Sequence, residues 1–408
     1  MSELSYLGKL LDGVEVEWKM LGEVIHSLKT GLNPRQNFSL NTLDAQGYYV
    51  TVREIQNGKV VFLDKTDRVN DRALKIINGR SNLEAGDILF SGTGTVGRIA
   101  VIEENPINWN IKEGVYTIKP IKEKIAPRFL SYLLQSSKIV KDYSKKIVGN
   151  PVISLPMGDL KKLLIPIPCP DNPEKSLAIQ SEIVRILDKF TALTAELTAE
   201  LTAELNMRKK QYNYYRDQLL SFKEGEVEWK TLGEVAVIGT GNHDTQDAIE
   251  HGKYIFYARG REPLKLNVFD FDETAIITAG DGAGVGKVFH YAKGKYALHQ
   301  RAYRIVPNAF MNPRFVYHYI TAYFFTYIQK ASVSSSVTSL RRPMFLKFPI
   351  PVPPSEEQAR IVEILDKFDT LTNSITEGLP REIELRQKQY EYYRDLLFSF
   401  PKPETVSN

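Results

Sequence analysis

The sequence has few of the residues that form disulfides, metal clusters and histidine-based active sites. Its 408 residues include one cysteine, Cys169, and six histidines. A single cysteine excludes an internal disulfide and a cysteine-based metal cluster, and it suits a reducing compartment. The chain has no GxxxxGK[ST] pattern, no histidine pair at metal-ligand spacing and no Asn-Pro-Pro-aromatic motif. We therefore expect no catalytic site, metal or cofactor on this chain.

Long apolar runs are also absent. No stretch approaches 18 apolar residues, so the sequence predicts no membrane-spanning helix and no membrane partner. The first residues lack the apolar core and basic flank of a secretion signal, and we expect a cytoplasmic protein. Charges nearly balance, with 53 Lys and Arg against 49 Asp and Glu, and the net charge of +4 permits an anionic partner without requiring one.

A stretch of forty residues occurs twice, at 183–222 and 361–400. ILDKF and YYRD recur in both copies at the same offset of 178 positions, without a gap. Such a match indicates an internal duplication.

Both copies are predicted to be long helices. Apolar residues recur at helical spacing, and Thr-Ala-Glu-Leu occurs three times in succession at 194–205. Forty helical residues form a rod of roughly 60 Å, which cannot bury its apolar stripe alone. We expect the two helices to pack antiparallel as a coiled coil. In the second copy, Gly378 and Pro380 predict a kink or short break near 376–380, because proline costs roughly 3 kcal/mol inside a helix.

The duplication extends into the segments before the helices. EVEWK and LGEV occur at Glu15–Val24 and at Glu226–Val235, and further motif pairs follow in the same order while the offset falls from 211 to 178. The halves are therefore collinear, and the second globular part is 33 residues shorter. The predicted organisation is an N-terminal segment 1–12, a first globular domain 13–165, a proline linker with the central helix 166–222, a second globular domain 223–348, and a proline linker with the C-terminal helix 349–408.

The end of the chain also matches its beginning. LLSF at the end of the first helix leads into the second EVEWK, and Leu10 and Leu11 precede the first EVEWK in the same way. Joining the termini would close a ring of two repeats, which predicts a pseudo-twofold molecule whose chain ends are neighbours. Two different heads on such a molecule suit two different halves of one linear target.

Short β-branched and aromatic runs predict strands in both globular domains. They are YYVTV, VVFL, GDILF and IAVIE in the first domain, and YIFYA, AIITA and VFHYA in the second. Proline fixes φ, so the bridges LLIPIPCPDNP and FPIPVPPSEE are interpreted as semi-rigid linkers. The predicted fold class is α+β, with two pseudo-twofold-related β-rich heads separated by two long antiparallel helices.

Gly92–Gly97 formally fits the GxGxxG dinucleotide fingerprint. The strand-like IAVIE follows it where a phosphate-binding helix should begin, and the matching loop 280–287 does not keep the spacing. We favour a tight glycine-rich hairpin, whose backbone can approach a partner closely. A nucleotide-dependent enzyme is a remote alternative. His243 and His299 lie beside other polar residues and are interpreted as surface side chains rather than catalytic ones.

Polar residues suited to nucleic acid gather in corresponding loops of the two domains. Arginine pairs with guanine edges and Asn or Gln with adenine, while Lys, Ser and Thr hold phosphates. The candidates in the first domain are Thr30, Asn33, Arg35, Gln36, Asn37, Arg53, Gly92, Thr93, Thr95 and Arg98. Those in the second are Thr240, Asn242, His243, Arg259, Arg261, Asp281, Lys287, Arg341 and Arg342. We align Arg53 with Arg259 and Arg98 with Lys287. Each residue alone is more often solvated surface, but their recurrence in two domains favours DNA binding.

These features resemble the specificity (S) subunits of type I restriction-modification systems. The resemblance rests on two heads, each followed by PIP and a helix that opens with Gln180-Ser-Glu-Ile-Val or Gln358-Ala-Arg-Ile-Val, and on ILDKF, YYRD and WKxLGEV. It covers essentially the whole chain, and the tandem Thr-Ala-Glu-Leu copies are similar to those of the IC subgroup.

The resemblance implies a subunit without catalysis of its own. Each head would read one half of a split, asymmetric target in double-stranded DNA, and the paired helices would set the spacer and dock two methyltransferase subunits. Those subunits would bind S-adenosylmethionine, and two restriction and motor subunits would bring ATP and Mg. The helix residues assigned to spacing and docking are Thr194, Leu197, Leu201, Leu205, Tyr215, Leu371 and Tyr393.

The dimensions of the Thr-Ala-Glu-Leu unit suggest that the repeat sets the length of the DNA spacer, as a molecular ruler would. Four residues lengthen a helix by roughly 6 Å and turn it about 40° beyond a full turn, while one base pair advances DNA by about 3.4 Å and turns it by roughly 35°. We hypothesise that each unit corresponds to one base pair of spacer. The alternative function is a coiled-coil scaffold whose heads bind proteins, and affinity that falls steeply with salt would favour DNA over it.

Overall fold

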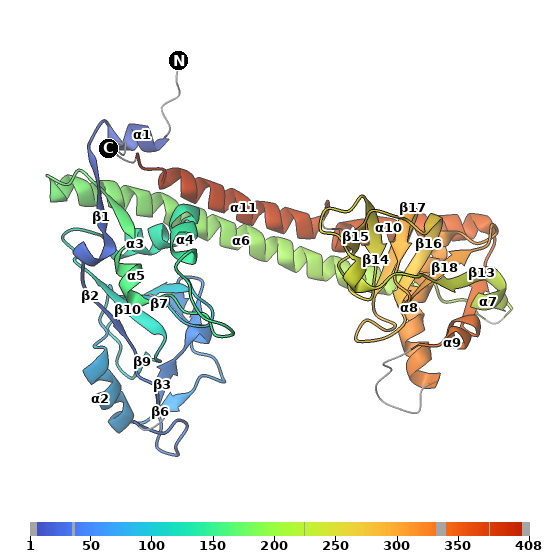
Figure 1. Ribbon diagram of the computed structural model, residues 1–408, viewed down its shortest axis with the longest axis horizontal. Coiled ribbons are helices and arrows are strands. Elements are labelled where there is room, and N and C mark those ends of the chain that lie inside the picture. Colours follow the sequence, from blue (N-terminus) through green and yellow to red (C-terminus); the bar gives the residue numbers. More distant parts are fainter. Residues whose placement is uncertain (1–5, 35–36, 224, 332–339, 375, 402–408) are drawn as a thin grey trace. The chain divides into compact units, whose positions relative to one another are not determined.

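The structure is a computed structural model that describes residues 6–34, 37–223, 225–331, 340–374 and 376–401. The chain divides into two compact units, one of Met1–Ala199 with Glu384–Asn408 and one of Glu200–Ile383. Both combine sheets with helices (Figure 1), which confirms the predicted α+β class. The 47-residue helix α6, Pro173–Leu219, contributes to both units and runs through all three Thr-Ala-Glu-Leu copies without a break.

The first unit contains a four-stranded sheet, a three-stranded sheet and two strand pairs, in the orders β2-β10-β7-β8, β6-β3-β9, β1-β11 and β4-β5. Its strands are β1 Val16–Met20, β2 Ile25–Thr30, β3 Gly47–Val50, β4 Ile55–Gln56, β5 Lys59–Val60, β6 Arg68–Val69, β7 Ile88–Ser91, β8 Ile99–Val101, β9 Trp109–Ile111, β10 Val115–Pro120 and β11 Leu164–Pro168. Its shorter helices are α1 Tyr6–Leu11, α2 Asp71–Arg80, α3 Pro127–Leu134, α4 Ser137–Ser144 and α5 Met157–Lys161, with 3-10 turns at Leu21–Glu23 and Val52–Glu54.

The second unit is built on one six-stranded sheet in the order β13-β18-β16-β17-β14-β15, with β12 and β19 forming a separate pair. Its strands are β12 Glu228–Thr231, β13 Ala236–Thr240, β14 Tyr254–Tyr257, β15 Leu264–Leu266, β16 Phe271–Ala279, β17 Phe289–Leu298, β18 Ala302–Pro307 and β19 Pro349–Val352. Its helices are α7 Leu232–Val235, α8 Pro313–Ala331, α9 Arg342–Leu346 and α10 Ser355–Asn373, with a 3-10 turn at Thr245–Asp247. Helix α11, Leu379–Leu397, begins in this unit and ends in the first.

Strand registers confirm the duplication. Thr30 of β2 pairs with Tyr116 of β10, just as Thr240 of β13 pairs with Tyr303 of β18. The next strand keeps the same order in both units, because β10 also pairs with β7 and β18 with β16. Three adjacent strands of one unit, counted from the edge of its sheet, therefore have counterparts in the other.

Strands β11 and β19 occupy the PIP part of the two proline-rich bridges, so the prediction of linkers was wrong for that part. β11 pairs antiparallel with β1, with Pro166 opposite Trp18, and β19 pairs antiparallel with β12, with Pro351 opposite Trp229. Prolines two residues apart turn their nitrogen atoms to the same side of a strand, so the side without N–H can face away from the partner. The alternating PIP pattern is thus compatible with a two-stranded ribbon.

The predicted strand VVFL is also corrected, since only Val60 belongs to a strand, β5. The side chains of Val61, Phe62 and Leu63 are 40%, 41% and 37% exposed. Phe62 instead stacks on Tyr48, with ring centroids 4.1 Å apart. The apolar run packs through this aromatic contact rather than through a sheet.

The predicted closure of the ring is confirmed within the first unit. Its main core contains Leu7 and Leu11 of α1 together with Phe398 and Phe400 from the other end of the chain. In the second unit, Leu220 at the end of α6 belongs to the core in the same way. Each core is therefore completed by the residues that follow a long helix.

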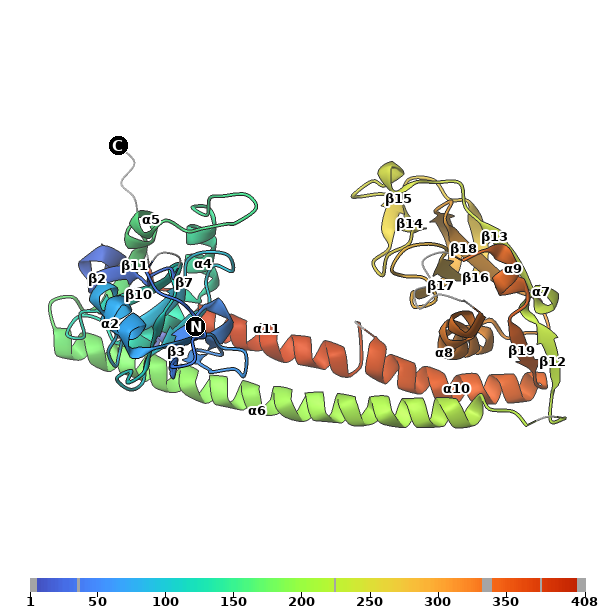
Figure 2. The ribbon, with the colours of Figure 1, turned by 90° about the horizontal axis from the view of Figure 1, so that it is seen from below.

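The long helices pack against each other in both units, as the two views show (Figures 1 and 2). In the first unit Phe190 of α6 stacks on Tyr393 of α11, with ring centroids 5.2 Å apart. In the second unit Phe368 of α10 stacks on Tyr215 of α6 at 5.5 Å. At the offset of 178 these are the same pair with the two helices exchanged, and within each unit the helices run antiparallel as predicted.

The predicted helix break is confirmed, because α10 ends at Asn373 and α11 begins at Leu379. Gly378 has φ +83°, a backbone conformation that favours glycine, and a Cβ there would lie 2.4 Å from the carbonyl oxygen of Thr370. Pro380 is the second residue of α11, where the missing N–H costs no helical hydrogen bond.

A buried glutamine binds each head to its long helix. The side-chain oxygen of Gln180 accepts the backbone N–H of Ala126 at 2.8 Å, and its amide donates to the carbonyl of Lys124 at 3.1 Å. Gln358 repeats this with the N–H of Asn312 at 2.6 Å and the carbonyl of Phe310 at 3.2 Å. The glutamines that supported the family resemblance therefore satisfy backbone groups at the start of α3 and α8.

The aspartate of each ILDKF motif adds an ion pair to the same helix. Asp188 accepts from Arg128 at 2.6 Å and from the Tyr132 hydroxyl at 2.7 Å. Asp366 accepts from Arg314 at 2.6 Å, and its other partner is the buried His318 at 2.7 Å. Burial alone would raise the pKa of Asp366, but these hydrogen bonds and the charge of Arg314 hold it below its usual range.

We expect Gln358→Leu to destabilise the second unit by about 1–3 kcal/mol, because three hydrogen bonds between the side-chain amide of Gln358 and backbone groups would be lost. Urea unfolding followed by a probe in the second unit measures this change. Gln218→Leu, at an exposed position of α6, is the control and should stay within about 0.5 kcal/mol of wild type. Equal stability of the two variants would contradict the role assigned to Gln358.

Candidate nucleic-acid interface

Three loops of the first unit meet where β2 and β7 end and β10 begins. The N–H of Gly114 donates to the hydroxyl of Thr30 at 3.0 Å, and the N–H of Gly92 donates to the carbonyl of Gly114 at 2.7 Å. The hydroxyls of Thr93 and Ser154 lie 3.2 Å apart, which adds the segment before Leu155. We call these joined loops the first loop edge, and its described residues are 30–34, 37, 92–98, 112–114 and 148–155.

Glycine is needed at this edge because neighbouring groups approach the backbone closely. A Cβ on Gly31 would lie 2.1 Å from the carbonyl oxygen of Ile111, and a Cβ on Gly92 would lie 2.1 Å from the ring of Tyr116. The loop at 92–97 is followed by strand β8, not by a helix, which agrees with a hairpin and not with a dinucleotide fold. Gly94 has φ +79° and open space around it.

The candidate residues of the first unit differ in exposure. Thr30 is buried, Gly92 is buried, and Asn33 and Thr93 are half-buried. The exposed candidates are Asn37, Arg53, Thr95 and Arg98. Arg35 and Gln36 lie outside the described residues.

Two arginines gather beside the turn after β3. Arg98 donates from Nη1 to the carbonyl of Val52 at 3.1 Å, and Arg53 donates from Nη2 to Asp67 at 3.3 Å. The Arg53 side chain is 52% exposed despite that ion pair. Both guanidinium groups can therefore reach an anionic partner.

The second unit has an equivalent edge, which we call the second loop edge, at residues 240–243, 258–262, 280–287, 299–301 and 340–342. Gly280 donates its N–H to the carbonyl of Arg301 at 2.8 Å, as Gly92 does to Gly114. Leu340 donates to the carbonyl of Gly280 at 2.7 Å, as Leu155 does to Gly92 at 2.8 Å. A Cβ on Gly241 would lie 1.8 Å from the carbonyl oxygen of Leu298, which repeats the constraint at Gly31.

These equivalences correct one alignment. Val50 pairs with Ile111 and Tyr257 pairs with Leu298 in the two parallel strand pairs, so the offset there is 207. Arg259 consequently matches Val52, and not Arg53 as the sequence motif suggested.

An aspartate joins two arginines at the second edge. Asp281 accepts from Arg259 Nη1 at 2.9 Å through one oxygen and from Arg301 Nη1 at 3.0 Å through the other. Burial alone would raise the pKa of Asp281, but the two guanidinium groups outweigh it and hold the pKa below its usual range. The sequence motifs pointed to Arg259 and Asp281 but not to Arg301, although Arg301 follows His299 and Gln300 in the sequence.

The other candidates of the second unit are placed as follows. Thr240, Asn242, Arg261, Lys287, Arg341 and Arg342 are exposed. The Lys287 ammonium lies over the ring of Phe325, 4.9 Å from its centroid. His243 is half-buried, with Nε2 3.0 Å from Asp270. Arg341 and Arg342 reach this edge because they follow Leu340, which is bonded to the glycine-rich loop.

His299 is 1% exposed, so its interpretation as a surface residue was wrong. Its Nδ1 accepts the N–H of Arg301 at 2.9 Å. Burial, followed by the charges of Arg259 and Arg301, lowers its pKa below 6.5, although Asp244 and Asp281 oppose this. His299 is therefore a neutral acceptor that holds the turn carrying Arg301.

This depressed pKa predicts how stability depends on pH. Below pH 6.5 the unfolded state takes up a proton that folded His299 resists, so the stabilisation present above that pH is lost as the pH falls through the folded pKa. One proton limits the slope to about 1.4 kcal/mol per pH unit. In urea unfolding at pH 7.5 and 5.5, we expect the stability of wild type relative to His299→Gln to be greater at pH 7.5. An equal difference at both pH values would exclude His299 as the cause.

The docking candidates lie on the helix pair. Tyr215 and Tyr393 form the aromatic contacts between helices described above, and Tyr215 remains 44% exposed. The remaining candidates are half-buried, and they are Thr194, Leu197, Leu201, Leu205 and Leu371. Their partners stay a prediction.

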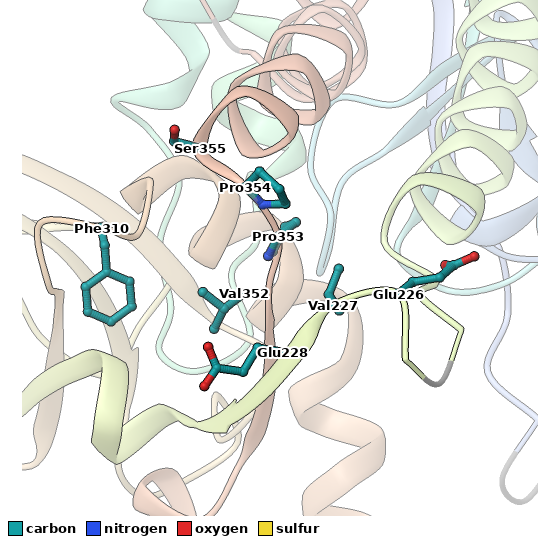
Figure 3. A pocket seen from close by; sticks show the side chains of 8 residues that line it. All are labelled: Glu226, Val227, Glu228, Phe310, Val352, Pro353, Pro354 and Ser355. Atoms are coloured by element: carbon teal, nitrogen blue, oxygen red, sulfur yellow. The ribbon is translucent and has the colours of Figure 1, made fainter.

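A pocket of about 590 Å³ lies elsewhere in the second unit, between β12, β19 and the start of α10 (Figure 3). Glu226 and Glu228 line it together with Phe310 and Pro353. Carboxylates repel phosphate, so this pocket does not suit a DNA backbone.

The described ranges contain no helix long and apolar enough to cross a bilayer. Within those same ranges, no three His, Cys, Asp or Glu side chains are grouped to hold a metal ion.

Two related heads, each with its own loop edge and each packed on a pair of long helices, define a two-headed class of protein. Comparison with known proteins identifies which one. A family model described as the type I restriction modification DNA specificity domain matches residues 14–207 and 224–385. The chain therefore belongs to the family of type I restriction-modification specificity subunits, as the sequence motifs predicted.

Individual relatives support this family assignment. The EcoR124I/EcoR124II specificity subunit of Escherichia coli is 42% identical over an alignment of 445 residues, and the alignment covers 100% of this chain and 100% of that protein. The EcoprrI specificity subunit of Escherichia coli is 39% identical over 386 residues, which cover 92% of this chain and 93% of that protein. A chain solved in work on complex assembly and conformational transition of the type I R-M system has a TM-score of 0.59 at 17% identity, covering 94% of this chain and 97% of its own, and it shows the shared fold.

Proposed function

We propose that this chain is the non-catalytic recognition subunit of a type I restriction-modification complex, and that each loop edge reads one half of a split DNA target. The observation that carries this is the repetition of the same hydrogen-bonded loops with different side chains. Gly114 of the first edge corresponds to Arg301 of the second, because their carbonyls accept from equivalent glycines. Different side chains on one scaffold predict two different half-sites and hence an asymmetric target.

We also propose that the paired helices set the spacer and dock two methyltransferase subunits. These would bring S-adenosylmethionine, and two restriction and motor subunits would bring ATP and Mg. Thr194, Leu197, Leu201 and Leu205 lie on the part of α6 that contains the repeat, and they are only half-buried in this single chain. A partner could cover the remaining surface.

The experiment maps methylated adenines in cells that express the chain with its cognate methyltransferase subunits. A split motif with two short half-sites and a fixed gap supports the proposal and gives the bases. Absence of new methylation, with binding of the partner verified, would favour the scaffold alternative. DNA affinity of the purified complex should also fall steeply as salt rises from 50 to 200 mM.

A further inference from the structure

The fork of Arg259, Asp281 and Arg301 leaves part of one arginine available to a ligand. Arg301 uses Nη1 for Asp281, and its side chain is 64% exposed against 39% for Arg259. Its remaining guanidinium N–H groups make no hydrogen bond to any residue that the structure describes. The fork keeps a formal charge of +1.

Arg301 is fixed at three points. Its carbonyl accepts from Gly280, its backbone N–H donates to His299 at 2.9 Å, and its guanidinium donates to Asp281 at 3.0 Å. A side chain held in this way loses less conformational entropy when it binds. The free edge of the guanidinium is therefore presented in a defined direction from the turn.

The fork is specific to the second unit. The residue that corresponds to Arg301 in the first unit is Gly114, which has no side chain. Arg259 corresponds to Val52 by the strand register. Whatever the fork recognises should thus belong to one half-site only.

The chemistry favours a base edge over a phosphate. Two N–H groups on one edge of a planar guanidinium match O6 and N7 of guanine in the major groove. A phosphate at the same place would meet the carboxylate of Asp281, which is ionised at neutral pH. We propose that Arg301 reads a guanine in the half-site of the second unit, with Asp281 as the residue that positions it. This rests on the proposed function.

The test uses the full chain in complex with its methyltransferase subunits. Methylation mapping first defines the two half-sites of wild type, and Arg301→Ala should then lose its preference at one G·C position of one half-site. Affinity for the wild-type site should fall roughly 5- to 150-fold, with little change for a site altered at that position. Arg301→Lys keeps a cation beside Asp281 but lacks the two-pronged edge, and it should lose the same preference.

A modified base tests whether Arg301 contacts N7 of the guanine. DNA with 7-deazaguanine at the assigned position lacks the N7 acceptor, so it should weaken binding of wild type but not further weaken Arg301→Ala. Asp281→Asn should relax the preference at the same position and at no other, with part of it retained. Lys293→Ala removes one exposed cation from the middle of β17 and serves as the control for charge, with an unchanged motif expected.

The outcomes distinguish failure of the Arg301 assignment from failure of the proposed function. An unchanged motif in Arg301→Ala, or a uniform loss of affinity for all sequences as for a phosphate contact, would overturn the assignment. A wild-type complex that methylates no split motif would instead overturn the proposed function itself.

Discussion

Deleting Thr202–Leu205 should shorten the unread spacer of the DNA target by one base pair while both half-sites stay the same. All original target sites would then be lost and a new set gained, which is the largest functional change expected here. The four residues lie inside the uninterrupted helix α6, so their removal takes out roughly 6 Å of rod and about 40° of rotation beyond a full turn. The rotation is close to that of one base pair, roughly 35°.

Methylation mapping of the deletion variant measures this change. Thr202→Ala keeps the helix length and should leave the spacer unchanged. Insertion of a fourth Thr-Ala-Glu-Leu copy should lengthen the spacer by one base pair, and it keeps the idea testable where the deletion fails to assemble. Altered half-sites, or an unchanged spacer in both length variants, would show that the repeat is not a ruler.

Phe398→Ala should destabilise the first unit by about 3–5 kcal/mol, the usual cost of removing a buried phenylalanine. Phe398 is 3% exposed, and its ring lies 5.5 Å from that of Phe129 in an edge-to-face arrangement. The reason is topological, since the end of the chain completes a core whose other residues come from its first half. A further tie at this end is the hydrogen bond from the Trp18 indole to the carbonyl of Pro401 at 2.8 Å.

Hydrogen exchange resolves the two units in the full chain. Amides of α3 should exchange faster in Phe398→Ala, while those of α8 should keep their protection. Tyr392→Ala is the matched control, because Tyr392 lies six residues before Phe398, on helix α11, and is 64% exposed. Equal loss of protection in both units, or none in α3, would contradict the closure of the ring through the first core.

The long helices could be predicted because their signal is local. Apolar spacing, helix-forming residues and a repeat of fixed offset depend only on the order of residues, and Gly378 and Pro380 marked the break for the same reason. The proline-rich bridges misled the prediction because strand pairing depends on a partner. EVEWK lies some 120 to 150 residues before the PIP strand that pairs with it, and the PIP sequence alone does not indicate which strand its partner is.

The candidate site was predicted in part. Residue types and matched loops pointed to Arg259, Asp281 and the glycine-rich hairpins, which do share an edge. Arg301 was missed because only the folded structure shows that its guanidinium is hydrogen-bonded to Asp281, an aspartate 20 residues away in the sequence. His299 was misjudged for a similar reason, since burial is a property of the packed fold and not of neighbouring residues.

The sequence by itself determined the duplication, the family, the two long helices and the interruption in the second. Repetition and periodicity depend only on the order of residues, so they can be detected without knowing any tertiary contact. Only the tertiary structure decided that the PIP segments are strands, that the buried side chains of Gln180 and Gln358 bond backbone groups of the heads, and that Phe398 closes the first core. It also placed Arg301 on Asp281. Each of these depends on groups distant in the chain meeting at hydrogen-bond or van der Waals distance, which residue order alone does not specify.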